Sequence, residues 1–466
     1  MKSKVSRFVL ASALLAAAVV PATAGAAPVP AAVKTSISSV SISFNGEARN
    51  IRVIQSGDTT LYSIKDLAEG YGLKAEYSNN TVLVKGNNTV RVNVGKADYT
   101  VNGQTAQFST NTQLVQDSLF IELTPFVKAL GGTVLELNGA TSIYTFPLLS
   151  GSFSHPQWIN NDELIAAAEG DDSSALYQIN PVTLASEKLS RNENSLQPVI
   201  SPDGMYGAFV DSRAQLQLLQ LNNGVNTPLG IDTTTKTDLV WSSDSKKIFF
   251  IQGDNQEKIS SIDLVTRSIT TILDDKVNFK SDLRVTPDNK TFLYTVNVTG
   301  TAVNDANSTL ESLTIDFSKA GQQLYLLDSA TKDAKPVQLT TANDNKLSPL
   351  LLPDGHAVYV SFNPDGDSVT GSLKLSAEAG KFTDLLSGLD VESTLLTASG
   401  QLIAIVSEGD LTTVYAVKEN GVKTKLFSTS LDITELAPSP DGSRFAAIVD
   451  GKVIVFKNNT VTQVTE

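Results

Sequence analysis

The chain has 466 residues, no cysteine and two histidines, and its 36 Lys and Arg stand against 49 Asp and Glu, giving a net charge of −13. Without cysteine it cannot form disulfides, thiolate metal sites or a cysteine-linked lipid anchor. Nucleic acid and anionic membrane surfaces are disfavoured as main partners because both require clustered Lys and Arg. The partner is therefore expected to be neutral or cationic.

Residues 1–26 have the pattern of a secretory signal peptide. Three basic side chains precede an apolar run over residues 8–20, and small residues with an A-x-A pattern follow. That run is too short for a membrane helix, and no later stretch is long and apolar enough to span a bilayer. We expect a secreted protein, extracellular or associated with the cell envelope. Residues 27–40, rich in Pro, Ala and Ser, are predicted to be a linker.

Residues 41–147 contain an internal echo that predicts a small α+β domain. The segments 61–72 and 120–131 both place apolar residues at helical spacing and end in glycine, and each leads into a β-prone stretch. Apolar residues in this pattern, closed by glycine, are typical of a short helix. Two short helices on small sheets are expected.

This domain resembles the copper amine oxidase N-terminal-like (stalk) domain. The resemblance is carried by Asn-Gly at 45–46, Val-Asn-Gly at 101–103, and residues 119–132 with their flanking strands. It implies a non-catalytic appendage. We do not expect copper, because both histidines, His155 and His356, lie outside the domain and thiolate ligands are absent.

The rest of the chain repeats one short motif, best seen as Ser-Pro-Asp-Gly at 201–204 and 439–442. Pro presets φ, Asp bonds its own backbone and Gly adopts positive φ, so the motif predicts a turn between two antiparallel strands. The Asp is expected to be structural rather than catalytic. The positions equivalent to this Asp are Asp162, Asp203, Asp244, Asp288, Asp354, Ser399 and Asp441. Their usual spacing of 41 to 45 residues is typical of a β-propeller blade with about four strands.

These units resemble the TolB-like family of β-propellers over residues 150–466, a resemblance that implies a fold more than a function. The predicted fold class is mostly β: a small α+β N-terminal domain followed by a β-propeller of seven blades, or six or eight if a terminal unit is split. One interval of 66 residues, between Asp288 and Asp354, predicts an insertion. We place it in residues 297–321, between the second and third strands of the fourth blade.

A search for catalytic motifs finds no G-x-S-x-G, H-E-x-x-H or P-loop sequence. The two histidines fall in different blades and cannot share a metal or a triad. His356, just after a turn, is expected to be an ordinary turn residue without assembled partners.

Counting back from each Asp position places one histidine and four carboxylates near one rim of the propeller. The candidate ligand-binding residues are His155, Asp238, Asp282, Glu392 and Glu435. Such a group would attract a cation or a basic peptide; the alternative is that the acids are solvated strand ends. No cofactor is expected. Calcium is kept as an alternative because residues 363–367 (Asn-Pro-Asp-Gly-Asp) faintly resemble a calcium loop, but they lack the later bidentate Glu and read more simply as a turn.

These observations favour a secreted, non-enzymatic binding or scaffold protein of the bacterial cell envelope. Its propeller rim would bind a protein, peptide or cationic ligand, or a cell-wall component. One alternative is a propeller enzyme, a polysaccharide lyase or a hydrolase, although a single candidate histidine in an acidic setting suits an acidic polysaccharide poorly. The other alternative is a purely structural envelope module.

Overall fold

The computed structural model describes residues 36–466 except 138, 170–173, 304–313, 317–319, 364–369, 387 and 459. The predicted signal peptide and most of the predicted linker lie outside this range. By its internal contacts the chain forms two compact units, the first ending at Leu123 and the second comprising Ile42–Ala48 and Thr124–Glu466. In the described part of the chain, no helix has the length and apolar character needed to cross a membrane.

The first unit contains two antiparallel β-arrangements and one short helix. One arrangement joins β2 (Glu47–Ser56), β3 (Thr59–Ser63), β10 (Ser118–Ile121) and β9 (Gln113–Val115). The other is a meander of β4 (Ala75–Ser78), β5 (Thr81–Lys85), β6 (Thr89–Asn93), β7 (Asp98–Val101) and β8 (Gln104–Gln107). The alternating burial of β5 and β6 explains the meander, since one face of each strand packs inward while the other meets solvent.

Helix α1 (Ile64–Gly70) begins at the N-cap Ser63, whose hydroxyl accepts from the Asp66 backbone N–H. The Arg52 guanidinium contacts both oxygens of Asp66, at 2.9 and 2.6 Å. Burial raises the pKa of the Asp66 carboxyl, but the hydrogen bonds and charge of Arg52 outweigh burial and hold that pKa below its ordinary value. The predicted helix in segment 61–72 is thus confirmed, and an ion pair fixes its first turn.

The second unit opens with the end of β1 (Ser38–Phe44), which pairs in parallel with β12 (Ala140–Tyr144). Strand β12 pairs antiparallel with β11 (Thr133–Leu137), and α2 (Leu123–Ala129) is the second predicted helix.

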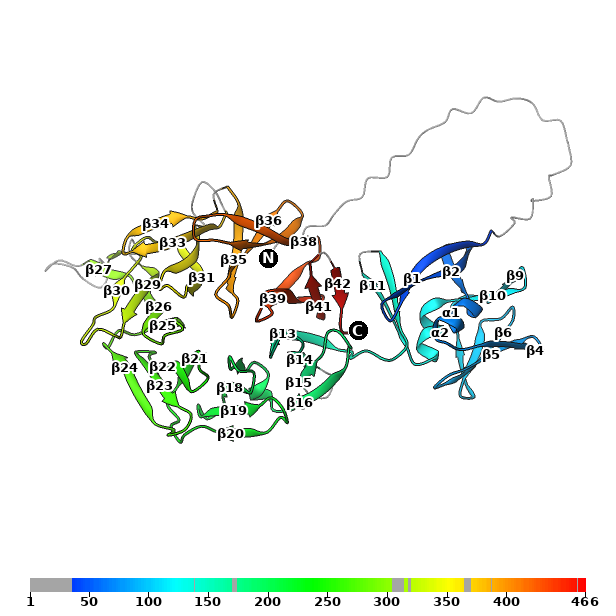
Figure 1. The fold of residues 1–466 in the computed structure, drawn as a ribbon, viewed down its shortest axis with the longest axis horizontal. Coiled ribbons are helices and arrows are strands. Elements are labelled where there is room, and N and C mark those ends of the chain that lie inside the picture. Colours follow the sequence, from blue (N-terminus) through cyan, green and yellow to red (C-terminus); the bar gives the residue numbers. More distant parts are fainter. Residues whose placement is uncertain are drawn as a thin grey trace, which may run out of the picture. The chain divides into compact units, whose positions relative to one another are not determined.

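Seven four-stranded antiparallel sheets follow within the described residues (Figure 1), and all but the fourth are built from consecutive strands. Blade 1 consists of β13 (Ser152–Trp158), β14 (Leu164–Glu169), β15 (Ala175–Ile179) and β16 (Ser186–Ser190). Blade 2 consists of β17 (Val199–Ile200), β18 (Tyr206–Val210), β19 (Leu216–Gln220) and β20 (Asn226–Pro228). Blade 3 consists of β21 (Lys236–Trp241), β22 (Lys247–Gln252), β23 (Lys258–Asp263) and β24 (Ile269–Asp274). Blade 4 consists of β25 (Lys280–Val285), β26 (Thr291–Val298), β29 (Gly321–Asp328) and β30 (Val337–Gln338).

Blades 5 to 7 complete the ring. Blade 5 consists of β31 (Asn345–Leu351), β32 (Ala357–Phe362), β33 (Ser372–Glu378) and β34 (Lys381–Asp384). Blade 6 consists of β35 (Asp390–Leu396), β36 (Leu402–Glu408), β37 (Leu411–Val417) and β38 (Lys423–Thr429). Blade 7 consists of β39 (Ile433–Pro438), β40 (Arg444–Val449), β41 (Lys452–Lys457) and β42 (Thr460–Gln463). A short 3-10 helix, η1 (Glu193–Ser195), precedes β17. The first strands that Figure 1 labels, β13, β21, β25, β31, β35 and β39, lie toward the centre of the ring. The predicted class, a mostly β chain with an N-terminal α+β domain and a propeller, is confirmed.

The predicted insertion in blade 4 is also confirmed. The sheet of blade 4 passes directly from β26 to β29, and β27 (Thr301–Val303) pairs with β28 (Thr314–Asp316) in a separate two-stranded sheet. The extra residues therefore leave the blade between its second and third strands.

In the described sheets, no strand from one end of the propeller joins the sheet at the other end. The two ends meet through side-chain packing and through backbone hydrogen bonds such as Phe153 N–H to the Gly451 carbonyl at 2.8 Å. Phe153 and Ala166 of blade 1 share a buried cluster with Ala446 and Ile448 of blade 7. The Trp158 indole donates to the Ala437 carbonyl at 3.0 Å. The same kind of contact joins blades 2 and 3, where the Trp241 indole donates to Val199 at 2.8 Å. The interface between the first and last blades therefore shares with the interface of blades 2 and 3 an indole that donates to a backbone carbonyl of the neighbouring blade.

The repeated motif forms a hydrogen-bonded turn, as predicted. The buried Ser201 hydroxyl donates to Asp203 Oδ1 at 2.6 Å, and the same carboxylate oxygen accepts the Met205 N–H at 3.0 Å. The hydroxyl also accepts the Tyr206 N–H at 2.9 Å, which joins the two sides of the turn. Equivalent hydroxyl–carboxylate pairs are Ser242–Asp244, Thr286–Asp288 and Ser439–Asp441. Each Asp therefore shapes a turn.

Replacing Gly204 by Ala should destabilise the propeller more than replacing Gly355. Both glycines have positive φ, +70° and +93°, so a Cβ at either position is strained by about 1 to 2 kcal/mol. At Gly204 the new Cβ would also lie 2.7 Å from the Ile159 carbonyl oxygen of the neighbouring blade, whereas at Gly355 no atom lies within 4 Å. Thermal unfolding of the two variants measures the difference. Equal losses would show that the blade interface moves apart easily at Ile159.

Candidate functional site

The innermost strands share an irregularity that organises the candidate site. In the described sheets, β13, β21, β25, β31, β35 and β39 each shift register against the next strand of their blade. Four residues at these bulges have left-handed backbone angles: His155 (φ 52°), Asp238 (φ 51°), Asp282 (φ 54°) and Ser348 (φ 47°). Such angles are uncommon for residues other than glycine, and bulges redirect side chains. We call these positions the bulge ring.

His155 and Glu435 meet where blade 1 adjoins blade 7. Glu435 Oε2 accepts the His155 backbone N–H at 2.8 Å and lies 3.4 Å from the imidazole Nδ1. On the opposite side of the imidazole, His155 Nε2 lies 2.6 Å from Gln197 Nε2. The imidazole is thus contacted at both nitrogens, by the Glu435 carboxylate at Nδ1 and by the Gln197 amide at Nε2. The carboxylate therefore orients the histidine.

Asp238 and Asp282 form an equivalent pair between blades 3 and 4. Asp238 Oδ1 accepts the Asp282 backbone N–H at 2.8 Å. Asp282 Oδ2 accepts from Gln322 Nε2 at 2.7 Å and from the Thr295 hydroxyl at 3.0 Å. In both pairs, then, a carboxylate from one blade satisfies the backbone N–H of a bulge residue in the next. A bulge frees that N–H from the strand ladder, so it needs such an acceptor.

Glu392 is exposed on β35. Among the described residues, no hydrogen bond or ion pair connects it to the other four candidates. The structure therefore brings four of the five predicted residues together as two pairs and leaves Glu392 apart. The calcium-like turn at 363–367 falls largely outside the described residues.

The sequence interpretation overlooked Arg284, which lies two residues after Asp282 on β25. Its guanidinium donates to the Leu283 carbonyl at 2.9 Å. Burial lowers the pKa of Arg284, while the charges of Asp282 and Asp238 act in the opposite direction, and an arginine stays protonated at neutral pH. The predicted acidic group thus contains a cation. A signal existed, because Arg284 stands four residues before its turn Asp, where the other units carry Trp158, Val199, Val240, Leu350, Leu395 and Ala437.

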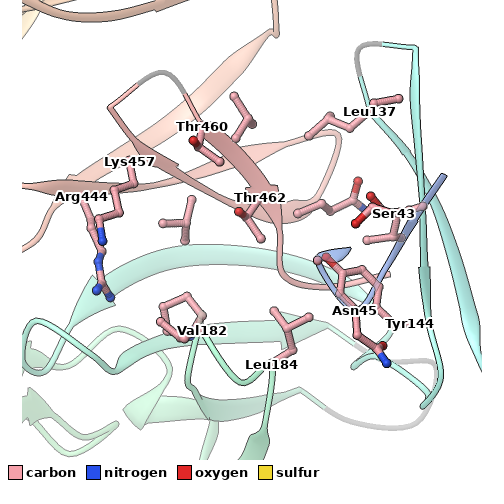
Figure 2. Close-up of a pocket in the computed structure, with 18 residues that line it drawn as sticks. Ser43, Asn45, Leu137, Tyr144, Val182, Leu184, Arg444, Lys457, Thr460 and Thr462 are labelled. Atoms are coloured by element: carbon pink, nitrogen blue, oxygen red, sulfur yellow. The ribbon is translucent and has the colours of Figure 1, made fainter. Parts of the chain in front are cut away.

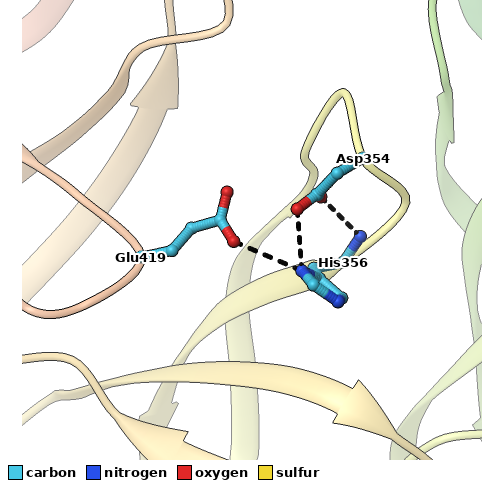
Figure 3. Close-up of side chains that lie close together, drawn as sticks. All are labelled: Asp354, His356 and Glu419. Atoms are coloured by element: carbon cyan, nitrogen blue, oxygen red, sulfur yellow. Dashed lines mark hydrogen bonds and ion pairs between the residues drawn. The ribbon is translucent and has the colours of Figure 1, made fainter.

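His356 is not the isolated turn residue that the sequence predicted. Its imidazole Nδ1 lies 2.8 Å from Asp354 Oδ2 and 3.3 Å from Glu419 Oε2 (Figure 3). Glu419 is 63 residues further along the chain and belongs to the neighbouring blade, so no local pattern could associate it with His356.

A pocket of about 600 Å³ also lies in the second unit, away from the bulge ring. Its wall is partly apolar, from Leu135, Val182 and Leu184, and partly polar, from side chains such as Thr460 and Thr462 (Figure 2). None of the predicted site residues lines it. Arg444, on one side of the pocket, is already engaged by the Asn161 carbonyl and Asp162.

The architecture defines the class of the protein: a β-propeller chain that carries a small α+β domain at its N-terminal side. Residues 39–145 match the copper amine oxidase N-terminal domain family, as the resemblance predicted. This segment contains no histidine or cysteine, so the nitrogen and sulfur donors that suit copper are absent from it. No curated protein matches the chain.

Solved structures with similarity to the chain include several propellers. Oligogalacturonate lyase in complex with manganese has 15% identity, a TM-score of 0.48 and coverage of 68% of this chain and 86% of the lyase. Puromycin hydrolase has 12% identity, a TM-score of 0.45 and coverage of 68% and 54%. The β-propeller domain of the Trilobed protease from Pyrococcus furiosus has 12% identity, a TM-score of 0.45 and coverage of 68% and 95%. At these values they assign no activity to this chain.

The prediction that the protein is not an enzyme was wrong. Two of the similar propeller chains, oligogalacturonate lyase and puromycin hydrolase, are enzymes, so neither the fold nor the missing motifs exclude catalysis. The scarcity of histidine was the weak step in that prediction, because one oriented imidazole can serve as a general base.

The acceptor role of Asp238 can be separated from its charge. Asp238→Ala should destabilise the propeller by about 1 to 3 kcal/mol, because the Asp282 N–H is left without its partner. Asp238→Asn keeps an amide oxygen at that position and should retain most of this stability. Melting temperatures of both variants, with the exposed Glu392→Ala as control, test the assignment. If Asp238→Asn is as unstable as Asp238→Ala, the charge rather than the acceptor matters.

Proposed function

We propose that the propeller binds a protein or peptide partner at the bulge ring, through a basic group that the partner inserts between the blades' inner strands. The observation that carries this proposal is the group of left-handed, non-glycine residues at equivalent bulges, with ionisable side chains at three of the four positions. Backbone strain of this kind persists only where the surrounding structure maintains it, and it is concentrated at functional sites.

The charges favour a cationic ligand. Asp238 and Asp282 act on the Arg284 guanidinium, and Glu435 adds a third carboxylate beside His155. With histidine counted as neutral, three carboxylates and one guanidinium give these groups a net charge of −2. Carboxylates in a partly enclosed space attract cations and steer them on approach. Arg284 offers a donor to carbonyl or carboxylate oxygens of the same ligand, so a peptide with a basic side chain fits better than a bare metal ion.

The proposed setting is outside the cell. The charged and apolar pattern of residues 1–26 supports export, and a binding propeller in the envelope or the medium would meet peptides and cell-wall components there. Calcium remains a weaker candidate ligand for the same carboxylates.

A short lysine peptide should bind the full chain with micromolar or weaker affinity. Binding should weaken when salt rises from about 20 to about 150 mM, since the Debye length falls from roughly 20 to about 8 Å. The double variant Asp238→Asn, Asp282→Asn should lose at least about tenfold in affinity by calorimetry, because each replaced charge removes part of the attraction. Glu392→Gln is the matched control and should bind like the original protein.

Two results would overturn this proposal. One is the absence of peptide binding at low salt; the other is unchanged binding in the double variant with its fold intact by circular dichroism. A neutral oligosaccharide that binds without salt dependence would point to a different class of ligand.

A second candidate function is catalysis by His155 as general base, in a lyase or a hydrolase. It rests on the orientation of the imidazole, which is held between the Glu435 carboxylate at Nδ1 and the Gln197 amide at Nε2. Turnover found in a panel of polysaccharide and peptide substrates should disappear in His155→Ala and fall in Glu435→Gln. Turnover that survives His155→Ala would remove this histidine from the mechanism.

A further inference from the structure

We propose that Asp354, His356 and Glu419 bind a divalent transition-metal ion, with Zn²⁺ as the best match, and that the ion links blades 5 and 6. These residues, which we call the rim triad, offer one imidazole nitrogen and two carboxylate oxygens, all within 4.8 Å of one another. In the described part of the chain, no other three His, Asp or Glu side chains come together in this way. The rim triad shares no residue with the bulge ring.

The turn of blade 5 positions two of the ligands. Asp354 Oδ1 accepts the His356 backbone N–H at 3.0 Å, which folds the chain back and directs Oδ2 toward the imidazole. In four other turns a Ser or Thr two residues before the Asp position donates its hydroxyl to the carboxylate. Here that position is Leu352, which has no hydroxyl. In those turns, as here, the hydrogen bonds within the turn use Oδ1, so Oδ2 of Asp354 is available for the site.

The turn between β37 and β38 supplies Glu419. Gly421 N–H donates to the Lys418 carbonyl at 2.8 Å and closes this turn. A Cβ at Gly421 would lie 2.8 Å from the Leu385 carbonyl oxygen, and a Cβ at Gly400 would lie 2.7 Å from Pro353 Cγ. Blades 5 and 6 thus approach closely at two turns of blade 6, one of which carries Glu419. Because the two turns are held at this separation, less ordering is required when an ion binds.

The distances suit a metal ion. Donor atoms held about 2.0 to 2.2 Å from one zinc ion lie roughly 3 to 3.5 Å apart. The Nδ1 to Oδ2 and Nδ1 to Oε2 distances are 2.8 and 3.3 Å (Figure 3), so Glu419 already stands at such a separation from the imidazole and Asp354 lies slightly closer. A neutral imidazole has a single proton to share at Nδ1, which serves one carboxylate and not two. A cation between the three donors would satisfy both acids.

The donor set also selects the kind of metal. Imidazole and carboxylate suit Zn²⁺ and similar borderline ions, and three protein ligands leave a coordination position for water. Calcium prefers six to eight oxygen ligands, which three residues with a nitrogen among them do not supply. Each blade is a self-contained sheet, so an ion held by both turns would add a direct link between neighbouring blades.

Nuclear magnetic resonance can test this site cleanly, because the chain has two histidines and therefore two imidazole signal sets. Titration of the full chain with Zn²⁺ alone should shift the ring nitrogens of His356, with Nδ1 as the metal-bound atom, and leave those of His155 in place. The His155→Ala variant assigns the two signal sets and should keep metal binding. The melting temperature should rise with Zn²⁺, since an ion that binds only the folded state stabilises it.

The decisive comparison is Glu419→Gln against the control Glu408→Gln, which alters a carboxylate at the end of β36, where it pairs with Leu411 at the start of β37. Glu419→Gln should weaken Zn²⁺ binding in calorimetry by at least about tenfold, a loss at least as large as those from changes to supporting residues of metal sites. Glu408→Gln should not weaken it. Zn²⁺ that leaves both histidines unshifted would overturn the proposal and show an ion pair only. Binding that is equal in both variants would show adventitious metal binding only.

Discussion

The crowding of inner strands around the propeller axis is the constraint on which the candidate site depends. These strands shift register in six of the described sheets, and each shift leaves backbone groups outside the ladder. A buried N–H without an acceptor is expensive, so a partner must be supplied. Asp238 and Glu435 supply it from the preceding blade, for Asp282 and His155. The charged side chains near the axis are therefore part of the architecture before they are part of any site.

This structural role changes the meaning of the acidic residues. They are neither simple solvated strand ends nor a set of unengaged charges, because each of the two inter-blade acids has a backbone donor. Yet the same hydrogen bonds hold the carboxylates in defined positions, and positioned groups bind with less loss of entropy than mobile ones. Arg284 adds to this effect, since a desolvated guanidinium near Asp282 and Asp238 provides a donor of opposite charge. A site with both signs of charge selects its ligand by geometry as well as by charge.

The repeated turns help determine how neighbouring blades pack in this chain. On the turn face, the hydroxyl–carboxylate pairs and the contacts across blade interfaces, such as Asp203 N–H with the Ser245 hydroxyl at 3.1 Å, determine how blades seat on one another. Blade 5 departs from the pattern at Leu352, which has no hydroxyl to donate, and at His356, whose imidazole contacts the Asp354 carboxylate. A departure from a repeated sequence places different chemistry on an unchanged fold. Arg284, in place of an apolar residue, is a second departure of the same kind.

Local patterns in the sequence determined most of the fold. The period of the turn motif predicted the propeller, the long interval before Asp354 predicted the insertion in blade 4, and helical spacing closed by glycine predicted α1 and α2. These features depend on neighbours within a few residues, where turn chemistry and apolar periodicity act. The candidate site was only partly predictable, because a repeat aligns equivalent positions but does not specify the register of each inner strand. Only the tertiary structure decided that Glu435 meets His155 across 280 residues, that Asp238 accepts from Asp282, and that Glu419 reaches His356. Those contacts arise between blades, where bulges and close backbone approach set the distances, and no local stretch of sequence contains that information.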